Sequence, residues 1–133
     1  MSATESPAET VRRGAEKMRK LASDATPGPW RNHDAYVPGG GYTATVLVGE
    51  GNDTKPLAWV PSSSNDPSEI DRQAWPDAVY IAAMDPSVAL LIAEQWDAVA
   101  LEIEGLRYGQ LSGSACLAVD AALKFLGEET AAE

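Results

Sequence analysis

The sequence predicts an α+β domain: an N-terminal helix, a small antiparallel sheet of two or three strands, and two to three C-terminal helices packed on one face of the sheet. Three observations predict this class. Apolar residues recur at helical spacing over residues 11–25, alternate with polar ones over 42–48, and return to helical spacing after residue 76. With 133 residues, of which 44% are hydrophobic and 23% charged, the chain can bury a core.

This length also falls within the range of one globular domain, so we expect a single domain over residues 1–133. Residues 1–8 are small and polar, which predicts a frayed start. Residues 127–133 follow the last apolar stretch and predict an acidic tail.

The first expected element is an amphipathic helix. Its apolar positions recur at spacings of three and four: Val11, Ala15, Met18, Ala22 and Ala25. Gly14 weakens such a helix by up to about 1 kcal/mol relative to Ala. The helix ends at Thr-Pro-Gly-Pro, residues 26–29, because proline disfavours helical geometry in the residue before it and has no amide donor. This turn brings Trp30 to a defined place, and we expect its ring in the core.

The middle of the chain predicts the sheet. Residues Tyr42–Val48 alternate between apolar and polar side chains, and Leu57–Val60 is a second apolar run. Gly49–Thr54 between them is rich in turn residues, which favours a β-hairpin, and Trp30–Val37 fits a further strand. A sheet this small needs helices over one face.

The C-terminal half predicts helices from Pro76 onward. Asp85-Pro86-Ser87 has the composition of a helix start, with Asp as N-cap and Pro at the first helical position. We expect a long core helix after it, with Gly105 at its end and with a stripe that comprises Val88, Leu91, Ile92, Trp96, Val99 and Ile103, widened by Leu90, Ala93 and Leu101.

The last expected helix begins at Ser112 or Ser114 and ends at Gly127. It is apolar nearly all round, with one side formed by Cys116, Val119, Leu123 and Leu126 and another by Ala118, Ala122 and Phe125. This is more apolar surface than one small core needs, so a homodimer through residues 114–126 is a hypothesis beside plain core packing.

Two segments carry a resemblance. The first is Ala-Glu-Lys-Met-Arg-Lys-Leu-Ala-Ser-Asp-Ala-Thr-Pro-Gly-Pro-Trp, residues 15–30, and the second is Asp-Ala-Val-Tyr-Ile-Ala-Ala-Met-Asp-Pro, residues 77–86. Together they resemble a group of small phage and prophage proteins, the Ead-like early-region proteins. The resemblance implies a mobile-element origin and an accessory role in host takeover or defence evasion, and it supplies no catalytic residues.

Charge narrows the partner classes. The net charge of −10 repels phosphate backbones and anionic membranes and favours a host protein with a basic surface. Residues 1–31 carry a net +2 and the remaining residues −12, which predicts either a basic helix face against an acidic body or a partner surface. The first residues lack the apolar region of a signal peptide and no apolar run is long enough to cross a bilayer, so we expect a cytoplasmic location in the host cell.

Chemistry-bearing motifs are few. The sequence has no phosphate-binding loop, zinc-helix or nucleophile-elbow pattern, and we expect neither an enzyme nor a cofactor. His33 beside Asp34 could act as a general base, but a surface pair is the favoured interpretation. With one His and one Cys the chain has neither a metal ligand set nor a disulfide, and Cys116 is expected to be an inert, buried thiol.

Two binding hypotheses follow. The leading one is an accessory protein that inhibits or redirects a host factor, such as a defence component, through the acidic residues of the long helix: Glu94, Asp97, Glu102 and Glu104. The alternative is a protein that sequesters a small nucleotide signal in an aromatic and basic recess formed by Trp30, Arg31, Trp59, Arg72 and Tyr80. A tryptophan-rich core is the structural alternative to that recess.

Overall fold

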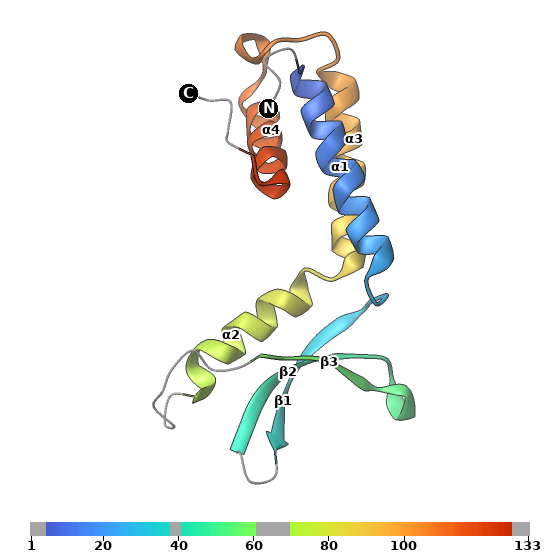
Figure 1. The fold of residues 1–133 in the computed structure, drawn as a ribbon, viewed down its shortest axis with the longest axis vertical. Coiled ribbons are helices and arrows are strands. Elements are labelled where there is room, and N and C mark those ends of the chain that lie inside the picture. Colours follow the sequence, from blue (N-terminus) through green and yellow to red (C-terminus); the bar gives the residue numbers. More distant parts are fainter. Residues whose placement is uncertain (1–4, 38–40, 61–69, 129–133) are drawn as a thin grey trace. The chain divides into compact units, whose positions relative to one another are not determined.

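The computed structural model describes the backbone of residues 5–37, 41–60 and 70–128, and most side chains within them (Figure 1). The described residues form four α-helices and a three-stranded antiparallel sheet, which confirms the predicted α+β class. They divide into two compact units. We call Met1–Ala25 with Ala89–Glu133 the helical unit, and Thr26–Val88 the sheet unit. The expectation of a single domain stays a prediction.

Helix α1 (Pro7–Asp24) begins earlier than the expected fraying of residues 1–8 allows. The hydroxyl of Ser6 accepts a hydrogen bond from the Glu9 N–H at 3.2 Å, and the Glu9 carboxylate accepts one from the Ser6 N–H at 3.4 Å. This capping box satisfies two amide donors at the helix start, and Pro7 suits the first turn. The expected fraying is therefore wrong for Pro7 and Ala8, which are buried, while residues 1–4 lie outside the described residues.

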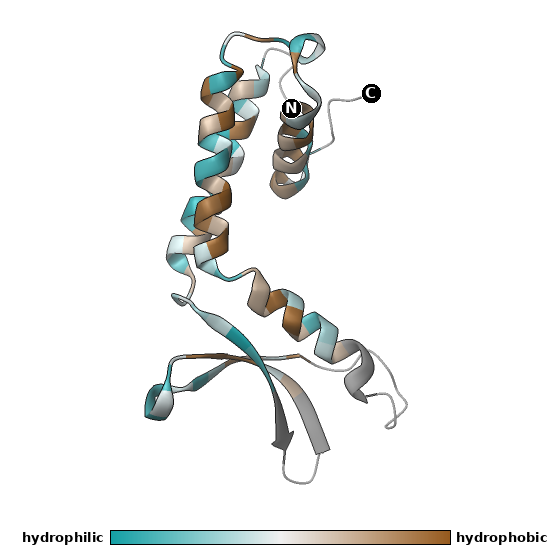
Figure 2. Ribbon diagram, turned by 180° about the vertical axis from the view of Figure 1, so that it is seen from behind, coloured by the Kyte–Doolittle hydropathy of each residue, from teal (hydrophilic) through white to brown (hydrophobic). Residues whose placement is uncertain are grey.

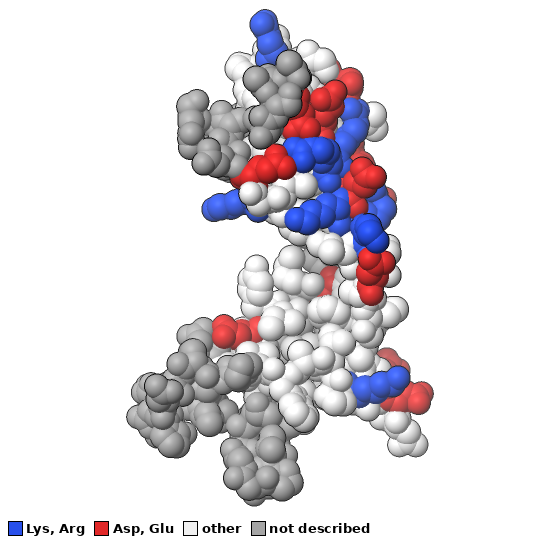
Figure 3. All heavy atoms as spheres, in the orientation of Figure 1, with Lys and Arg blue, Asp and Glu red and all other residues white. Residues whose placement is uncertain are grey.

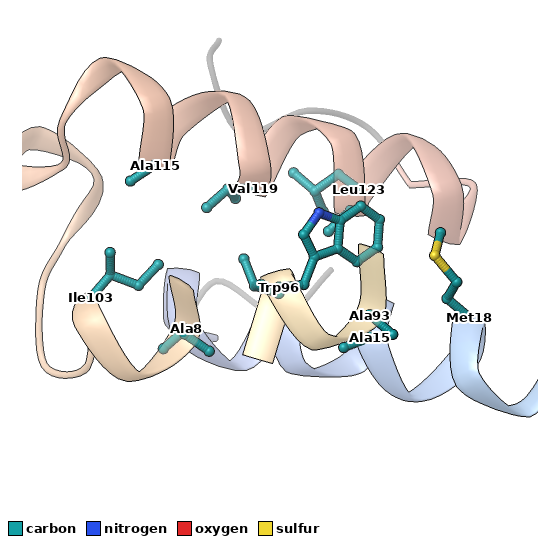
Figure 4. Packing of buried hydrophobic residues seen from close by; sticks show 12 residues of the cluster. Ala8, Ala15, Met18, Ala93, Trp96, Ile103, Ala115, Val119 and Leu123 are labelled. Carbon is teal, nitrogen blue, oxygen red and sulfur yellow. The ribbon is translucent and has the colours of Figure 1, made fainter. Parts of the chain in front are cut away.

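The core of the helical unit is formed by α1, α3 (Pro86–Glu102) and α4 (Gly113–Leu126). Figure 4 shows the Trp96 ring beside Leu123 of α4. Gly14 is a contact residue here: a Cβ at this position would lie 2.9 Å from the Ala122 Cβ and 3.0 Å from the Trp96 ring. Helix propensity alone therefore gives the wrong sign for Gly14, because the missing Cβ lets three helices meet.

The buried stripe of α3 differs from the expected one. Leu91 and Leu101 are 66% and 73% exposed, so they do not contribute to the core. Of the expected stripe, Ala93, Trp96 and, just past the helix, Ile103 are buried in this core, and Ala100 joins them. Alanine carries a weak hydrophobic signal in a sequence, and large exposed leucines outweigh it in a periodicity argument.

Both expected caps of α4 are confirmed. The Ser112 hydroxyl accepts a hydrogen bond from the Ala115 N–H at 3.2 Å. Gly127 has φ of 77° and closes the helix with two hydrogen bonds, from its own N–H to the Lys124 carbonyl and from the Glu128 N–H to the Leu123 carbonyl. Gly105, with φ of 81°, likewise turns the chain after α3. Of the expected acidic tail, residues 129–133 lie outside the described residues.

The sheet unit contains β1 (Trp30–Val37), β2 (Gly41–Val48) and β3 (Lys55–Val60), which are hydrogen-bonded in the order β1-β2-β3. The expected hairpin is confirmed, with a short 3₁₀ helix, η1 (Gly51–Asp53), in its loop. Helix α2 (Ile70–Ala83) covers one face of this sheet. The buried contact is made of small residues and two valines: Ala74, Ala78 and Ala82 of α2, and Ala44, Val46 and Val60 of the sheet.

Helix α2 starts at Ile70, although the sequence favours a start at Pro76. Pro76 lies inside the helix and supplies no amide donor, which normally ends or bends a helix. Here Ala74, before the proline, and Ala78, after it, are both buried against the sheet. Burial of the same helix face on both sides of Pro76 accounts for a helix that continues through it.

The junction between α2 and α3 is organised by Asp85, which is 7% exposed. Its carboxylate accepts hydrogen bonds from the Ser87 N–H at 2.9 Å and the Val88 N–H at 3.3 Å, which confirms it as the N-cap of α3. It also accepts the backbone N–H of Trp30 at 3.2 Å. The Ser87 hydroxyl, then the backbone N–H groups, stabilise the carboxylate and hold the pKa of Asp85 below its usual value.

Candidate functional site

The four acidic residues of the leading hypothesis do not form a uniformly acidic surface. Asp97 pairs with Arg19, and Glu104 pairs with Arg12. Both arginines lie on α1. Glu94 and Glu102 are exposed and make no ion pair with any described residue. Figure 3 shows the basic side chains of the helical unit lying between acidic ones. The basic first helix thus contacts acidic residues of the same chain, in agreement with the first of the two expectations for the charge asymmetry.

A second charge cluster joins α1 to the chain beyond α4. The guanidinium of Arg13 donates to Glu5 at 2.5 and 2.7 Å and to Glu128 at 2.8 Å. These bonds lower the pKa values of Glu5 and Glu128 and raise that of Arg13. Lys17, although exposed, contacts α4, because its ammonium donates to the Phe125 carbonyl at 3.1 Å and lies 5.1 Å from the centre of the Phe125 ring. Intramolecular contacts therefore use much of the basic face of α1.

The four described residues of the proposed nucleotide recess, Trp30, Arg31, Trp59 and Tyr80, do not share one surface. Trp30 packs against the core under α2, whereas the neighbouring Arg31 is on the opposite face of β1, because successive strand residues alternate. Arg31 donates to the Gly49 carbonyl and, at 3.1 Å, to the Thr54 hydroxyl, so it fastens the β2–β3 loop. The expectation of one recess is wrong for these residues. The side chain of Arg72 lies outside the described residues.

Trp59 is on the face of the sheet that α2 leaves uncovered. The strand register places it beside Thr45, and Thr45 beside His33, in one row across the sheet. Trp59 is 68% exposed and His33 is exposed, whereas Thr45 between them is buried. The general-base hypothesis pairs His33 with Asp34, whose side chain lies outside the described residues.

The remaining candidates for chemistry are Cys116 and acidic clusters. Cys116 is a free thiol, and it is half-buried and not fully buried as expected. Among the residues that the structure describes, no group of three His, Cys, Asp or Glu side chains could hold a metal ion.

The surface that sequence reasoning missed is the outer side of α2. Helical spacing puts its inner alanines on the sheet and leaves one long apolar side, which we call the outer face of α2 and which consists of Trp75, Pro76, Val79, Tyr80 and Ala83. Tyr80 is 70% exposed, Val79 40% and Trp75 39%. Met84, just past the helix, is 41% exposed as well. Exposed aromatic and aliphatic side chains grouped in this way are typical of interaction sites in other proteins.

Charge is almost absent from this part of the chain. Between Ala74 and Met84 the sequence contains one charged residue, Asp77. Figure 2 shows brown, hydrophobic residues alternating with pale and teal ones along α2. The signal that could have found this face is the alternation of alanine with large apolar residues in Ala-Val-Tyr-Ile-Ala-Ala, residues 78–83, since a two-sided apolar helix needs two partners.

No single helix of the described chain is long and apolar enough to cross a bilayer. Ala74–Ala83 and Pro86–Glu102 reach the required length and composition only as a bent pair, and nothing beyond length and composition supports a span there. The predicted absence of a membrane partner and the cytoplasmic location stay predictions.

Comparison with protein-family models, with curated proteins and with solved structures finds no match to this chain. The resemblance to the Ead-like early-region proteins stays a prediction. The two segments that carry it contact each other in the sheet unit, where the Asp85 carboxylate of the second accepts the Trp30 N–H of the first. Their most visible role is therefore structural.

Proposed function

We propose that this protein works by binding another protein through the outer face of α2. The observation that carries the proposal is the exposure of Tyr80, Val79 and Trp75 on a helix side with almost no charge. The centres of protein interfaces are depleted in charged residues and enriched in Trp, Tyr and Met, and Trp and Tyr supply much of their binding energy.

The support beneath this face suits it to binding. Ala74, Ala78 and Ala82 hold α2 on the sheet, so Tyr80 and Trp75 project from a fixed helix. Side chains on a rigid element lose less conformational entropy when a partner binds than side chains on a loop. The partner expected from this chemistry has an apolar groove or patch that accepts two aromatic side chains.

In functional terms, a binder of this kind inhibits or redirects a host factor by occupying a surface that the factor needs. This is the accessory role that the resemblance implies, with the apolar face in place of the acidic one as the main contact. Exposed charges elsewhere on the chain, such as Glu94 and Glu102 of α3, attract a basic partner over a distance and affect its rate of association more than its affinity.

The test is quantitative capture of partners by the tagged full chain from host lysate, compared across variants. Tyr80→Glu should reduce retention of the partner at least tenfold, because a buried interface tyrosine is worth more than about 1.4 kcal/mol. Leu101→Glu is the matched control: Leu101 is 73% exposed, similar to Tyr80 at 70%, and lies outside the outer face of α2. It should retain the partner.

Two results would overturn the proposal. Retention that survives Tyr80→Glu but is lost in the double variant Glu94→Lys, Glu102→Lys assigns capture to the acidic residues. If Tyr80→Glu abolishes binding to anionic lipid vesicles but leaves the set of captured proteins unchanged, the outer face of α2 is assigned to a membrane. Circular dichroism on each variant checks that the helices are intact.

A further inference from the structure

A groove lies between α3 and α4 in the helical unit. Its volume is about 610 Å³, and it is lined on the α3 side by Trp96 and Val99 and on the α4 side by Ala118 and Ala121. Helix α4 packs closely on α1 and not on α3. The sides of α3 and α4 that face the groove therefore have no helix packed against them. The walls are mixed, because Gln95, Glu102 and Gln110 line the groove beside its apolar residues, and a cavity of this size has room for large side chains of a further helix.

We propose that this groove is the self-association site of the chain, and that it receives α4 of a second copy, running antiparallel to the first α4. Each copy would then insert its α4 into the groove of the other copy, as a two-fold symmetric interface requires. This inference concerns the helical unit and does not rest on the outer face of α2.

The side of α4 that borders the groove fits a second helix. Ser114, Leu117, Ala118 and Ala121 all line the groove, and their spacing puts them on one side of the helix. Leu117 is 71% exposed at the lip, where a partner helix would bury it. The two alanines and the serine are small, which lets a second helix approach closely.

Charge complementarity identifies the second helix as another α4. Glu102 lines the groove, is exposed, and makes no ion pair within the part of the chain that the structure describes. Lys124 is exposed in the last turn of α4 and, among the described residues, also makes none. Lys124 follows Leu117 by two helical turns, so it continues the same side of α4.

The antiparallel geometry brings these two charges together. If Leu117 of one copy lies opposite Ala121 of the second, Lys124 lies opposite the second copy's Ser114. Ser114 and Glu102 line the same groove, so this register brings the ammonium of one copy to the groove that carries the carboxylate of the other. Two-fold symmetry forms this contact twice, and it favours the antiparallel register over the parallel one.

The experiment is sedimentation velocity on the full chain over a concentration series. The proposal predicts a reversible shift from the 14.1 kDa monomer to twice that mass. Leu117→Glu should raise the dissociation constant at least tenfold, because it removes an apolar side chain from the interface and adds a carboxylate to a groove that Glu102 already lines. Leu101→Glu, at a similarly exposed leucine that does not line the groove, should leave it unchanged.

A reciprocal charge exchange tests the register. Lys124→Glu should weaken the dimer, and adding Glu102→Lys to the same chain should restore it, which a purely structural effect of either substitution would not do. A wild-type chain that stays monomeric at every concentration overturns the proposal, as does a dimer that Leu101→Glu weakens as much as Leu117→Glu. Partner capture that persists in the monomeric Leu117→Glu variant would show that the outer face of α2 acts independently of dimer formation, so the two proposals can fail separately.

Discussion

The carboxylate of Asp85 accepts the backbone N–H of Trp30 at 3.2 Å, from a residue 55 positions earlier in the chain. The same carboxylate caps the first turn of α3 through Ser87 and Val88. Gly28 lies directly against it, since a Cβ there would come within 2.7 Å of an Asp85 oxygen. One buried side chain therefore explains why this turn contains glycine, where β1 begins and where α3 begins.

The first prediction concerns Gly28. Gly28→Ala should destabilise the protein, because the new methyl group displaces the Asp85 carboxylate from Trp30 and from its cap. Asp85→Ala should cost about 2–3 kcal/mol through loss of the cap and of a charge-assisted hydrogen bond. In the double variant the methyl group has room, so the double variant should be destabilised by clearly less than the sum of the two single losses of unfolding free energy. Urea unfolding of the four proteins measures this, and strict additivity would contradict the contact.

The second prediction is a pH dependence. The pKa of Asp85 in the folded protein lies below its usual value, first because of the Ser87 hydroxyl and then because of backbone N–H groups. The unfolded chain therefore binds the proton more readily, so this carboxylate contributes stability above its unfolded pKa, and the contribution is lost as pH falls through the folded pKa. The difference in unfolding free energy between wild type and Asp85→Ala should be constant near neutral pH and shrink below about pH 4. A difference that grows on acidification would mean that folding raises the pKa of Asp85, which contradicts the account.

The third prediction concerns helix packing at Gly14. In an isolated helix Gly→Ala is stabilising by about 1 kcal/mol. Here Gly14→Ala should lower the melting temperature instead, because the Cβ would lie 2.9 Å from Ala122 and 3.0 Å from Trp96. Adding Ala122→Gly should recover part of the loss by removing one of the two contacts. Thermal unfolding followed by circular dichroism decides it, and a more stable Gly14→Ala would show that the three helices are not this close.

The fourth prediction concerns Arg13 and Glu5. The Arg13 hydrogen bond is the main cause of the lowered pKa of Glu5. Arg13→Gln should therefore raise the pKa of Glu5 toward its usual value and lower the melting temperature. Lys20→Gln is the control, because Lys20 pairs with Asp24, one turn along on the exposed side of α1. Carbon-detected NMR titration of the Glu5 carboxyl gives the comparison, and an unchanged Glu5 pKa in Arg13→Gln would refute the assignment.

Local chemistry explains which parts of the fold the sequence predicts. The caps at Asp85, Ser112 and Gly127 are correct because each depends on a side chain or a glycine acting within a few residues. The hairpin is correct for the same reason. The start of α2 is not, because Pro76 suggests a helix boundary locally while burial against the sheet carries the helix through it.

Tertiary contacts explain what the sequence does not predict about the site. The pairing of Asp97 with Arg19 depends on α1 lying beside α3, and no pattern within either helix indicates it. The recess hypothesis failed for a different reason, since Trp30 and Arg31 are neighbours on a strand and must face opposite ways. The exposure of Tyr80 could be inferred only once Ala78 was known to face the sheet.

The central claim is that the outer face of α2 contacts a protein partner, and site-specific photo-cross-linking in host cells tests it most directly. A benzophenone amino acid replaces Tyr80 in one variant, Glu94 in a second and Leu101 in a third, all three being exposed in the structure. The account predicts one discrete protein adduct from position 80, competed by excess wild-type chain, and none from position 101. An adduct from position 94 with none from position 80 would contradict it and return the contact to the acidic residues of α3.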